Sequence, residues 1–154
     1  MGYYVKIVSG VVTIPKETQE RVLNRWKMIN GPQFDHLKRG GSFRGDMQKR
    51  ESWYSWMSKD YHLTVNSCEE VLDMLGFDFT VEDTGDISVT GYDNKTGQED
   101  KFFAAIHKWV HGGFTWMGED GECYDWVFPI EQYDPSNIIE NLAWQQLALT
   151  NSEG

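Results

Sequence analysis

The stretch FTWMGEDGECYDWVF, residues 114–128, specifies its local structure more fully than any other part of the chain. Gly118 and Gly121 bound an acidic turn, where glycine supplies the permissive backbone that a tight turn requires. Successive side chains of a strand point to opposite faces, so the run after the turn separates into two sets. One set is Tyr124, Trp126 and Phe128, and the other is Cys123, Asp125 and Val127. The stretch predicts a β-hairpin whose aromatic residues pair across its strands.

Other segments upstream also have the composition of strands. Residues 77–82 alternate apolar and polar side chains, residues 83–86 have the composition of a turn, and residues 87–92 form a returning run. These segments predict a second β-hairpin. Residues 3–14 are rich in valine, isoleucine and tyrosine, and they predict a strand with a tight turn or a bulge around Gly10.

Apolar residues at helical spacing predict a helix after the first strand. Pro15 suits its first position, and Trp26 lies on its apolar stripe. Asn30 followed by Gly31 and Pro32 is expected to end it, with a left-handed cap and then a residue that cannot continue a helix.

Two more helices have start and stop signals in the sequence. Residues 67–75 begin with the Ser-x-x-Glu spacing of a capping box, and Gly76 closes the segment. After a loop predicted at residues 93–97, the spacing Thr-x-x-Glu starts a strongly amphipathic helix over residues 98–111. Gly112 and its neighbour Gly113 are expected to end that helix.

The remaining segments complete the predicted organisation. Residues 31–50 are rich in glycine and basic side chains and predict an irregular loop, and the aromatic residues 53–57 have no assigned state. A last helix is predicted up to residue 149, and residues 150–154 are expected to be a disordered tail. Hairpins that alternate with helices predict an α+β fold, an antiparallel sheet of hairpins with helices mainly on one face, as a single domain over residues 1–149.

The net charge of −10 conceals a polarity along the chain. Residues 1–59 carry 11 basic and 5 acidic side chains, whereas residues 60–154 carry 3 basic and 19 acidic side chains. Two interpretations are open: a soluble acidic surface, or a negative face that docks on a basic partner or imitates nucleic acid. Seven Trp, seven Tyr and eight Phe indicate either aromatic packing or an exposed aromatic binding surface.

Metal and thiol chemistry have only weak candidates. His107 and His111 lie four apart on a predicted helix, a spacing that suits two metal ligands, but two surface histidines near a helix C-terminus, where positive charge is favoured, are the more expected arrangement. Cys68 follows a predicted helix start, where the helix dipole lowers a thiol pKa, yet it also lies on the apolar stripe of that helix. Cys123 is the second candidate nucleophile. We therefore expect no cofactor and no catalytic residue.

The acidic turn does not match a calcium loop or a catalytic pair of carboxylates. An EF-hand that started at Glu119 would place Gly121 and Cys123 at ligand positions. Hydrolysis by two carboxylates requires one sheltered acid with a raised pKa, whereas acids at a hairpin tip are solvated. The sequence also contains no glycine-rich nucleotide motif, no GxSxG and no CxxC, which favours a non-enzymatic protein.

A basic segment precedes a short aromatic one. The pair could bind nucleic acid through phosphate contacts and base stacking, or it could be a solvated loop followed by buried aromatics. The acidic charge of the remaining chain makes direct nucleic-acid binding the less expected of the two. The residues are Lys38, Arg39, Arg44, Lys49 and Arg50, and then Trp53, Tyr54 and Trp56.

One combination of motifs resembles a known group of proteins. The chain carries GDI at residues 85–87, KTGQE at residues 95–99, an amphipathic helix, and the hairpin motif W-x-GEDGE-x-Y-x-W-x-F. Over residues 65–128 this order resembles a diffuse group of small, uncharacterised proteins of bacteriophages and bacteria. Tyr124 stands where that group often has Trp, and Cys123 lies outside the shared pattern. The resemblance implies a phage origin and supplies no activity.

These features predict a non-enzymatic, phage-derived accessory protein in the cytoplasm of the host cell. It would bind and modulate or inhibit a host protein of the transcription, restriction or CRISPR-type defence machinery, as small accessory proteins of phages often do. The alternatives are a structural or assembly component of a phage particle or homo-oligomer, and a metal-assisted enzyme. No apolar run has membrane-spanning length, and no signal peptide is evident. The predicted partner-binding residues are Trp116, Glu119, Asp120, Glu122, Tyr124, Asp125 and Trp126.

Overall fold

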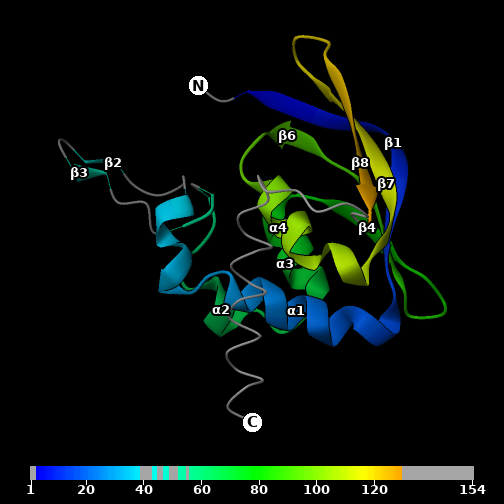
Figure 1. Ribbon diagram of the computed structural model, residues 1–154, viewed down its shortest axis with the longest axis horizontal. Coiled ribbons are helices and arrows are strands. Elements are labelled where there is room, and N and C mark those ends of the chain that lie inside the picture. The colour runs from blue at the N-terminus through cyan, green and yellow to red at the C-terminus, as the bar shows by residue number, and fades with distance from the viewer. Residues whose placement is uncertain (1–2, 39–42, 45–46, 49–51, 55, 130–154) are drawn as a thin grey trace.

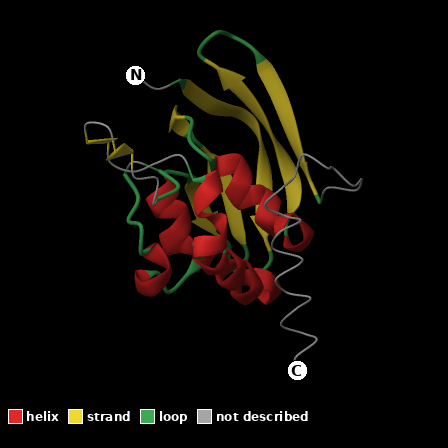
Figure 2. Cartoon of the chain, turned by 60° about the vertical axis from the view of Figure 1, so that its left-hand side comes forward, coloured by secondary structure: helices red, strands yellow, loops and turns green. Residues whose placement is uncertain are grey.

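An antiparallel sheet forms one layer of the protein, and the helices gather on one of its faces (Figures 1 and 2). The computed structural model describes residues 3–38, 43–44, 47–48, 52–54 and 56–129. The strands of the sheet are β1 (Tyr4–Ile14), β4 (Asp78–Val81), β5 (Ile87–Gly91), β6 (Asp93–Lys95), β7 (His111–Gly118) and β8 (Cys123–Phe128). The predicted α+β class is confirmed. The helix predicted up to residue 149 and the tail at residues 150–154 lie outside the described residues.

The helical layer consists of short helices. They are η1 (Lys16–Thr18), α1 (Gln19–Met28), η2 (Pro32–Leu37), α2 (Tyr61–Thr64), α3 (Cys68–Leu75), α4 (Glu99–Ile106) and η3 (His107–Trp109). A separate two-stranded sheet, β2 (Phe43–Arg44) with β3 (Met47–Gln48), lies away from the main sheet (Figure 1). The prediction that residues 31–50 are irregular is therefore wrong for η2, β2 and β3. The structure also adds α2, which no sequence signal indicated.

Strand β1 is the centre of the sheet, in the order β4-β5-β1-β7-β8. One edge of β1 pairs with β7, and the other edge pairs with β5 near Ile14 and with β6 near Tyr4. The predicted interruption of this strand is a bulge, because the register to β7 shifts between Ile7 and Ser9. Gly10 follows the bulge with φ of 100°, and a Cβ there would lie 2.2 Å from the carbonyl oxygen of Gly113. That close approach of two backbones leaves room only for glycine.

Both predicted hairpins are present, as the pairs β4–β5 and β7–β8. Two neighbouring predictions are wrong. The expected loop at residues 93–97 contains β6, because Asp93 to Lys95 pair with the start of β1. Gly112 and Gly113 do not end a helix but lie inside β7, where Gly112 pairs with Phe128.

The predicted capping residues are confirmed for α3 but not for α1 and α4. The Ser67 hydroxyl accepts a hydrogen bond from the Glu70 amide, and Gly76 ends α3 with φ of 97°, as predicted. Helix α1 ends without a left-handed residue, since the described residues contain no non-glycine residue with positive φ. Helix α4 starts after Gln98, whose side chain makes no capping hydrogen bond, and not after Thr96. It gives way to η3 at residue 107, earlier than predicted.

The core between the layers is aromatic. Phe103 of α4 packs edge-to-face on Phe114 of β7, with ring centroids 5.8 Å apart. Trp116 is fully buried, and its ring lies 4.8 Å from that of Trp126. On the helical side, the Trp26 indole N–H donates to the Phe102 carbonyl over 2.9 Å. The core therefore absorbs much of the aromatic surplus of the sequence.

Candidate functional site

The turn between β7 and β8 is closed by its own backbone. The Gly118 amide donates to the Glu122 carbonyl over 2.9 Å, and the Gly121 amide donates to the Gly118 carbonyl over 2.9 Å. Gly121 has φ of 86°, a conformation in which a Cβ is strained even though open space surrounds it. The sequence therefore fixes the turn, and the acidic side chains of residues 119–122 project from it.

The start of β1 holds this turn in place. The Glu119 amide donates to the Tyr4 carbonyl over 2.9 Å, and the Tyr4 amide donates in return to Glu119 Oε1 over 3.3 Å. The Tyr3 hydroxyl donates to Asp120 Oδ1, which also accepts from the Glu122 amide over 3.0 Å. We call Tyr3, Tyr4, Glu119, Asp120, Glu122 and Tyr124 the tip surface.

The tip surface carries stable negative charge. The hydrogen bond from the Tyr3 hydroxyl, followed by that from the Glu122 backbone, lowers the pKa of Asp120 below its usual value. The same contact raises the pKa of Tyr3. A lowered carboxyl pKa is the opposite of what a catalytic acid requires, because such an acid must keep its proton near neutral pH. Asp120 is therefore suited to present a charge rather than to transfer a proton.

Exposed tyrosines accompany these acids. Tyr4 is 45% exposed and Tyr124 is 42% exposed, and Tyr124 stacks on the buried Trp116 with an interplanar angle of 10°. Partial burial raises the pKa of Tyr124, so its hydroxyl stays neutral. The tip surface thus combines acids with exposed tyrosine rings, of which that of Tyr124 lies against the buried Trp116.

The structure places the predicted partner-binding residues in three locations: the tip surface, the outer face of β8 and the core. Glu119, Asp120, Glu122 and Tyr124 belong to the tip surface, and Asp125 lies on the outer face of β8, where it accepts from the Thr115 hydroxyl over 2.8 Å. Neither predicted tryptophan belongs to the tip surface. Trp116 is fully buried and Trp126 is half-buried against it, because the aromatic face of the hairpin turns toward the helices.

The outer face of the sheet adds apolar residues that the sequence analysis did not single out. Val8, Val11 and Val127 are exposed there, Val127 by 70%. The register places Val11 opposite Gly113, and Gly113 opposite Val127, in adjacent strands. The period-two alternation of β8 already placed Val127 on the face opposite the aromatics, so this signal was present in the sequence.

The two acidic turns of the sheet lie at opposite ends of β1. The β4–β5 turn carries Glu82, Asp83 and Asp86, and it lies next to the end of β1, where the Lys16 amide donates to Asp86 over 2.8 Å. The tip surface lies next to the start of the same strand. Because β1 has 11 residues, about 33 Å separates the two turns.

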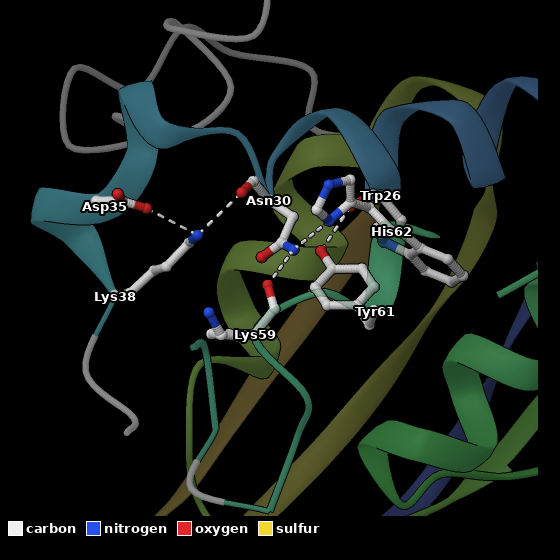
Figure 3. A network of polar contacts seen from close by, with 7 residues as sticks. All are labelled: Trp26, Asn30, Asp35, Lys38, Lys59, Tyr61 and His62. Atoms are coloured by element: carbon white, nitrogen blue, oxygen red, sulfur yellow. Dashed lines mark hydrogen bonds and ion pairs between the residues drawn. The ribbon is translucent and has the colours of Figure 1, made fainter. Parts of the chain in front are cut away.

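The basic segment has a different character from the predicted exposed loop. Lys38 is only 2% exposed, and its ammonium donates to the Asn30 carbonyl over 3.0 Å and to Asp35 over 2.9 Å (Figure 3). It is a structural cation rather than a phosphate contact. Arg44 lies in β2. The positions of Arg39, Lys49 and Arg50 lie outside the described residues.

Lys38 belongs to a buried polar network that joins α1 to the segment around α2 (Figure 3). The Asn30 side-chain amide donates to the Lys59 carbonyl over 2.7 Å and contacts His62 Nδ1 over 2.7 Å. Nearby, the Tyr61 hydroxyl donates to the Trp26 carbonyl over 2.6 Å. These contacts lie within the chain and join two parts of the fold, although the buried Asn30 Oδ1 has no hydrogen-bond partner among the described residues.

The aromatic residues after the basic segment also turn inward. Trp53 and Tyr54 are buried, and the Tyr54 hydroxyl donates to the buried Glu99 over 3.1 Å. Only Trp56 has a substantial exposed area. Two of the three rings therefore have no free face on which a base could stack.

The metal and thiol candidates are not brought together. His107 is buried in η3 and His111 begins β7, so the helix that would align them is absent. Among the described residues, no three His, Cys, Asp or Glu side chains gather as a metal site requires. Burial raises the pKa of the Cys68 thiol to about 12, and the thiol donates to the Gln19 carbonyl over 3.2 Å. Cys68 is therefore a structural cysteine, whereas Cys123 is exposed.

None of the helices in the described part of the chain has the length and hydrophobicity that crossing a bilayer requires. Comparison with protein-family models, curated proteins and solved structures gives no significant match.

Proposed function

We propose that this is a non-enzymatic binding protein that docks through the tip surface on a basic surface of a partner protein. The observation that carries the proposal is the joint anchoring of acids and tyrosines on two strands far apart in the sequence, through the contacts of Tyr3 and Tyr4 with residues 119 and 120. Acids on such a surface steer association with a basic partner, and tyrosine is enriched at protein interfaces.

The fixed geometry of the tip surface supports a binding role. A surface that is already ordered loses little conformational entropy when it binds. The mutual hydrogen bonds of Tyr4 and Glu119 hold the turn on β1, and the Gly118–Glu122 pair closes it. Tyr124 adds a ring face that Trp116 supports from below. Docking there requires no rearrangement of the sheet.

The partner we propose is a host protein of the transcription, restriction or CRISPR-type defence machinery. This choice rests on the phage origin that the resemblance of residues 65–128 implies, because small accessory proteins of phages often act on such machinery. We favour docking at one local site over imitation of a nucleic-acid duplex, because the two acidic turns lie at opposite ends of β1.

Affinity purification from a bacterial lysate, followed by titration of the captured protein, tests this proposal. The double variant Glu119→Gln/Glu122→Gln removes two charges from the tip surface and leaves the Tyr3–Asp120 contact intact. The matched control, Glu82→Gln/Asp83→Asn, removes two charges from the other turn. We expect the tip variant to bind roughly tenfold more weakly and with a smaller salt dependence, and the control to bind like the wild type. Equal binding by both variants, or no captured partner, contradicts the proposal.

Self-association is a second candidate function, and the exposed Val8, Val11 and Val127 favour it. Contiguous apolar residues on an outer sheet face are typical of surfaces that another molecule covers. Sedimentation of the wild type and of Val127→Thr separates this candidate from docking at the tip surface. A wild type that stays monomeric at every concentration removes it.

A further inference from the structure

The side-chain amide of Asn30 uses one of its polar atoms twice and leaves the other unused. Nδ2 donates to the Lys59 carbonyl over 2.7 Å and contacts His62 Nδ1 over 2.7 Å (Figure 3). Oδ1 is buried, and none of the described residues donates a hydrogen bond to it. A carbonyl can only accept, so the contact with Lys59 fixes which end of the amide faces these two partners. Asn30 therefore presents an N–H group to His62.

This orientation fixes the protonation state of His62. Nδ1 accepts the hydrogen bond, so it carries no proton, and the ring is the neutral form with its proton on Nε2. A proton on Nδ1 would point at the N–H group of Asn30. Turning the amide over would offer Oδ1 to that proton, but it would also set Oδ1 against the Lys59 carbonyl oxygen. Once His62 is charged, neither orientation of Asn30 satisfies both neighbours.

The charges of the segments that meet at Asn30 also oppose a further positive charge. Three lysines face two aspartates, and each aspartate already pairs with a lysine, over 2.9 Å in one pair and 3.9 Å in the other. Burial raises the pKa of the neighbouring Tyr61, which stays neutral. The charged and titratable groups are Lys27 on α1, Asp35 and His36 on η2, Lys38 directly after η2, and Lys59 and Asp60 directly before α2.

We propose that Asn30 and His62 form a pH-sensitive latch that fastens α2 and the residues before it to the end of α1. The latch is closed while His62 is neutral. When His62 takes up a proton, its contact with Asn30 breaks, and residues 57–65 are held less firmly against α1. Opening also gives Asn30 Oδ1 access to water, which offsets part of the lost hydrogen bonding. The latch uses no residue of the tip surface and stands independently of the proposed function.

The direction of the pH effect follows from which state binds the proton. The closed latch requires an unprotonated Nδ1, whereas an imidazole released into water takes up its proton near the usual histidine value of about 6.5. Opening therefore becomes more favourable as the pH falls. A solvated histidine is about nine-tenths protonated at pH 5.5, so we expect the open population to rise about tenfold between pH 7.5 and pH 5.5. Aspartates keep their charge over this range.

Amide hydrogen exchange of the full-length protein at pH 7.5 and pH 5.5, corrected for the intrinsic pH dependence of exchange, tests this proposal. The reporters are the Leu63 and Val65 amides, which donate to the Asp60 and Tyr61 carbonyls. We expect the opening equilibrium at both amides to be about tenfold larger at pH 5.5. His62→Asn keeps an acceptor near Nδ1 that does not titrate, so it is expected to remove the pH dependence. The matched control His36→Asn, at an exposed position of η2, is expected to keep it.

The ¹⁵N chemical shifts of the His62 ring provide a second readout, which needs no variant. We expect Nδ1 to be the unprotonated nitrogen at pH 7.5 and Nε2 to carry the proton. Opening that does not change with pH in the wild type, or a proton on Nδ1 at pH 7.5, overturns the proposal. So does a pH dependence that survives in His62→Asn or disappears in His36→Asn.

Discussion

The two hairpins of the sheet carry acidic turns that look alike in sequence but differ in support. The β7–β8 turn is backed by the aromatic core and is joined to the start of β1 by contacts from Tyr3 and Tyr4. Strand β4 ends in Val81, which is 55% exposed. The turn that follows is joined to the residues after β1 by two hydrogen bonds, from the Lys16 amide to Asp86 and from the Gln19 side-chain amide to the Gly85 carbonyl, each over 2.8 Å. Both turns are therefore anchored near an end of β1, and the difference lies in the strands, because β4 is an exposed edge strand whereas β7 packs its aromatic side chains into the core.

We expect the largest effect on stability from the buried core beneath the β7–β8 hairpin. Trp116→Ala removes a fully buried indole from beneath the β7–β8 hairpin, and we expect a loss of about 3–5 kcal/mol in the free energy of unfolding. Val81→Ala, in the other hairpin, is expected to cost less than about 0.5 kcal/mol. Urea denaturation followed by far-ultraviolet circular dichroism measures both. A similar loss in the two variants would show that the hairpins are equally supported.

The turn backbone predicts an intermediate effect. Gly121→Ala places a Cβ at φ of 86°, which we expect to cost about 1–2 kcal/mol, although no neighbouring atom obstructs it. Gly85 of the other turn has φ of 92°, and a Cβ there also approaches the flexible Lys16 side chain at 2.8 Å. Thermal unfolding of the two alanine variants compares the turns. A neutral Gly121→Ala would mean that the turn relaxes without loss.

The smallest effect concerns titration at the tip surface. Tyr3→Phe removes the hydroxyl that lowers the pKa of Asp120, so we expect that pKa to rise toward the usual aspartate value of about 3.9. The pKa of Asp120 is lower in the folded than in the unfolded protein, so this contact stabilises the fold at pH values above the unfolded-state pKa. The stabilisation is lost as the pH falls through the folded-state pKa. A ¹³C-detected carboxyl titration reads the shift. An unchanged Asp120 pKa would assign its lowering to the backbone of Glu122 instead.

Much of the fold could be predicted because short-range signals dominate in its hairpins and in α3. Period-two alternation identified the strands of residues 114–128, and the Ser67 cap and Gly76 marked both ends of one helix. The misassigned segments depend on distant partners. Residues 93–95 become a strand only because β1 supplies an edge, and Gly112 becomes part of a strand because its backbone must approach Val11 closely.

The candidate site could be predicted only in part, because some of its residues are brought together by contacts between distant parts of the chain. The acids of the turn were evident from the sequence, but the direction of the aromatic face depends on where the helices pack. Trp116 therefore turned out to be core, and Tyr3 and Tyr4, 115 or more residues away from the turn in sequence, supplied its neighbours. Lys38 likewise became a buried cation because Asn30 and Asp35 surround it.

The central position of β1 has a consequence for how the protein is made. This strand is synthesised before the strands that pair with it, since β5 and β7 begin only at Ile87 and His111. At a translation rate of about 5–20 residues per second, a nascent β1 rich in valine and isoleucine waits roughly 5–20 s for the strand that pairs along most of its length. During that interval we expect β1 to have unpaired edges, and we expect its pairing with β7, a contact of high sequence separation, to slow folding.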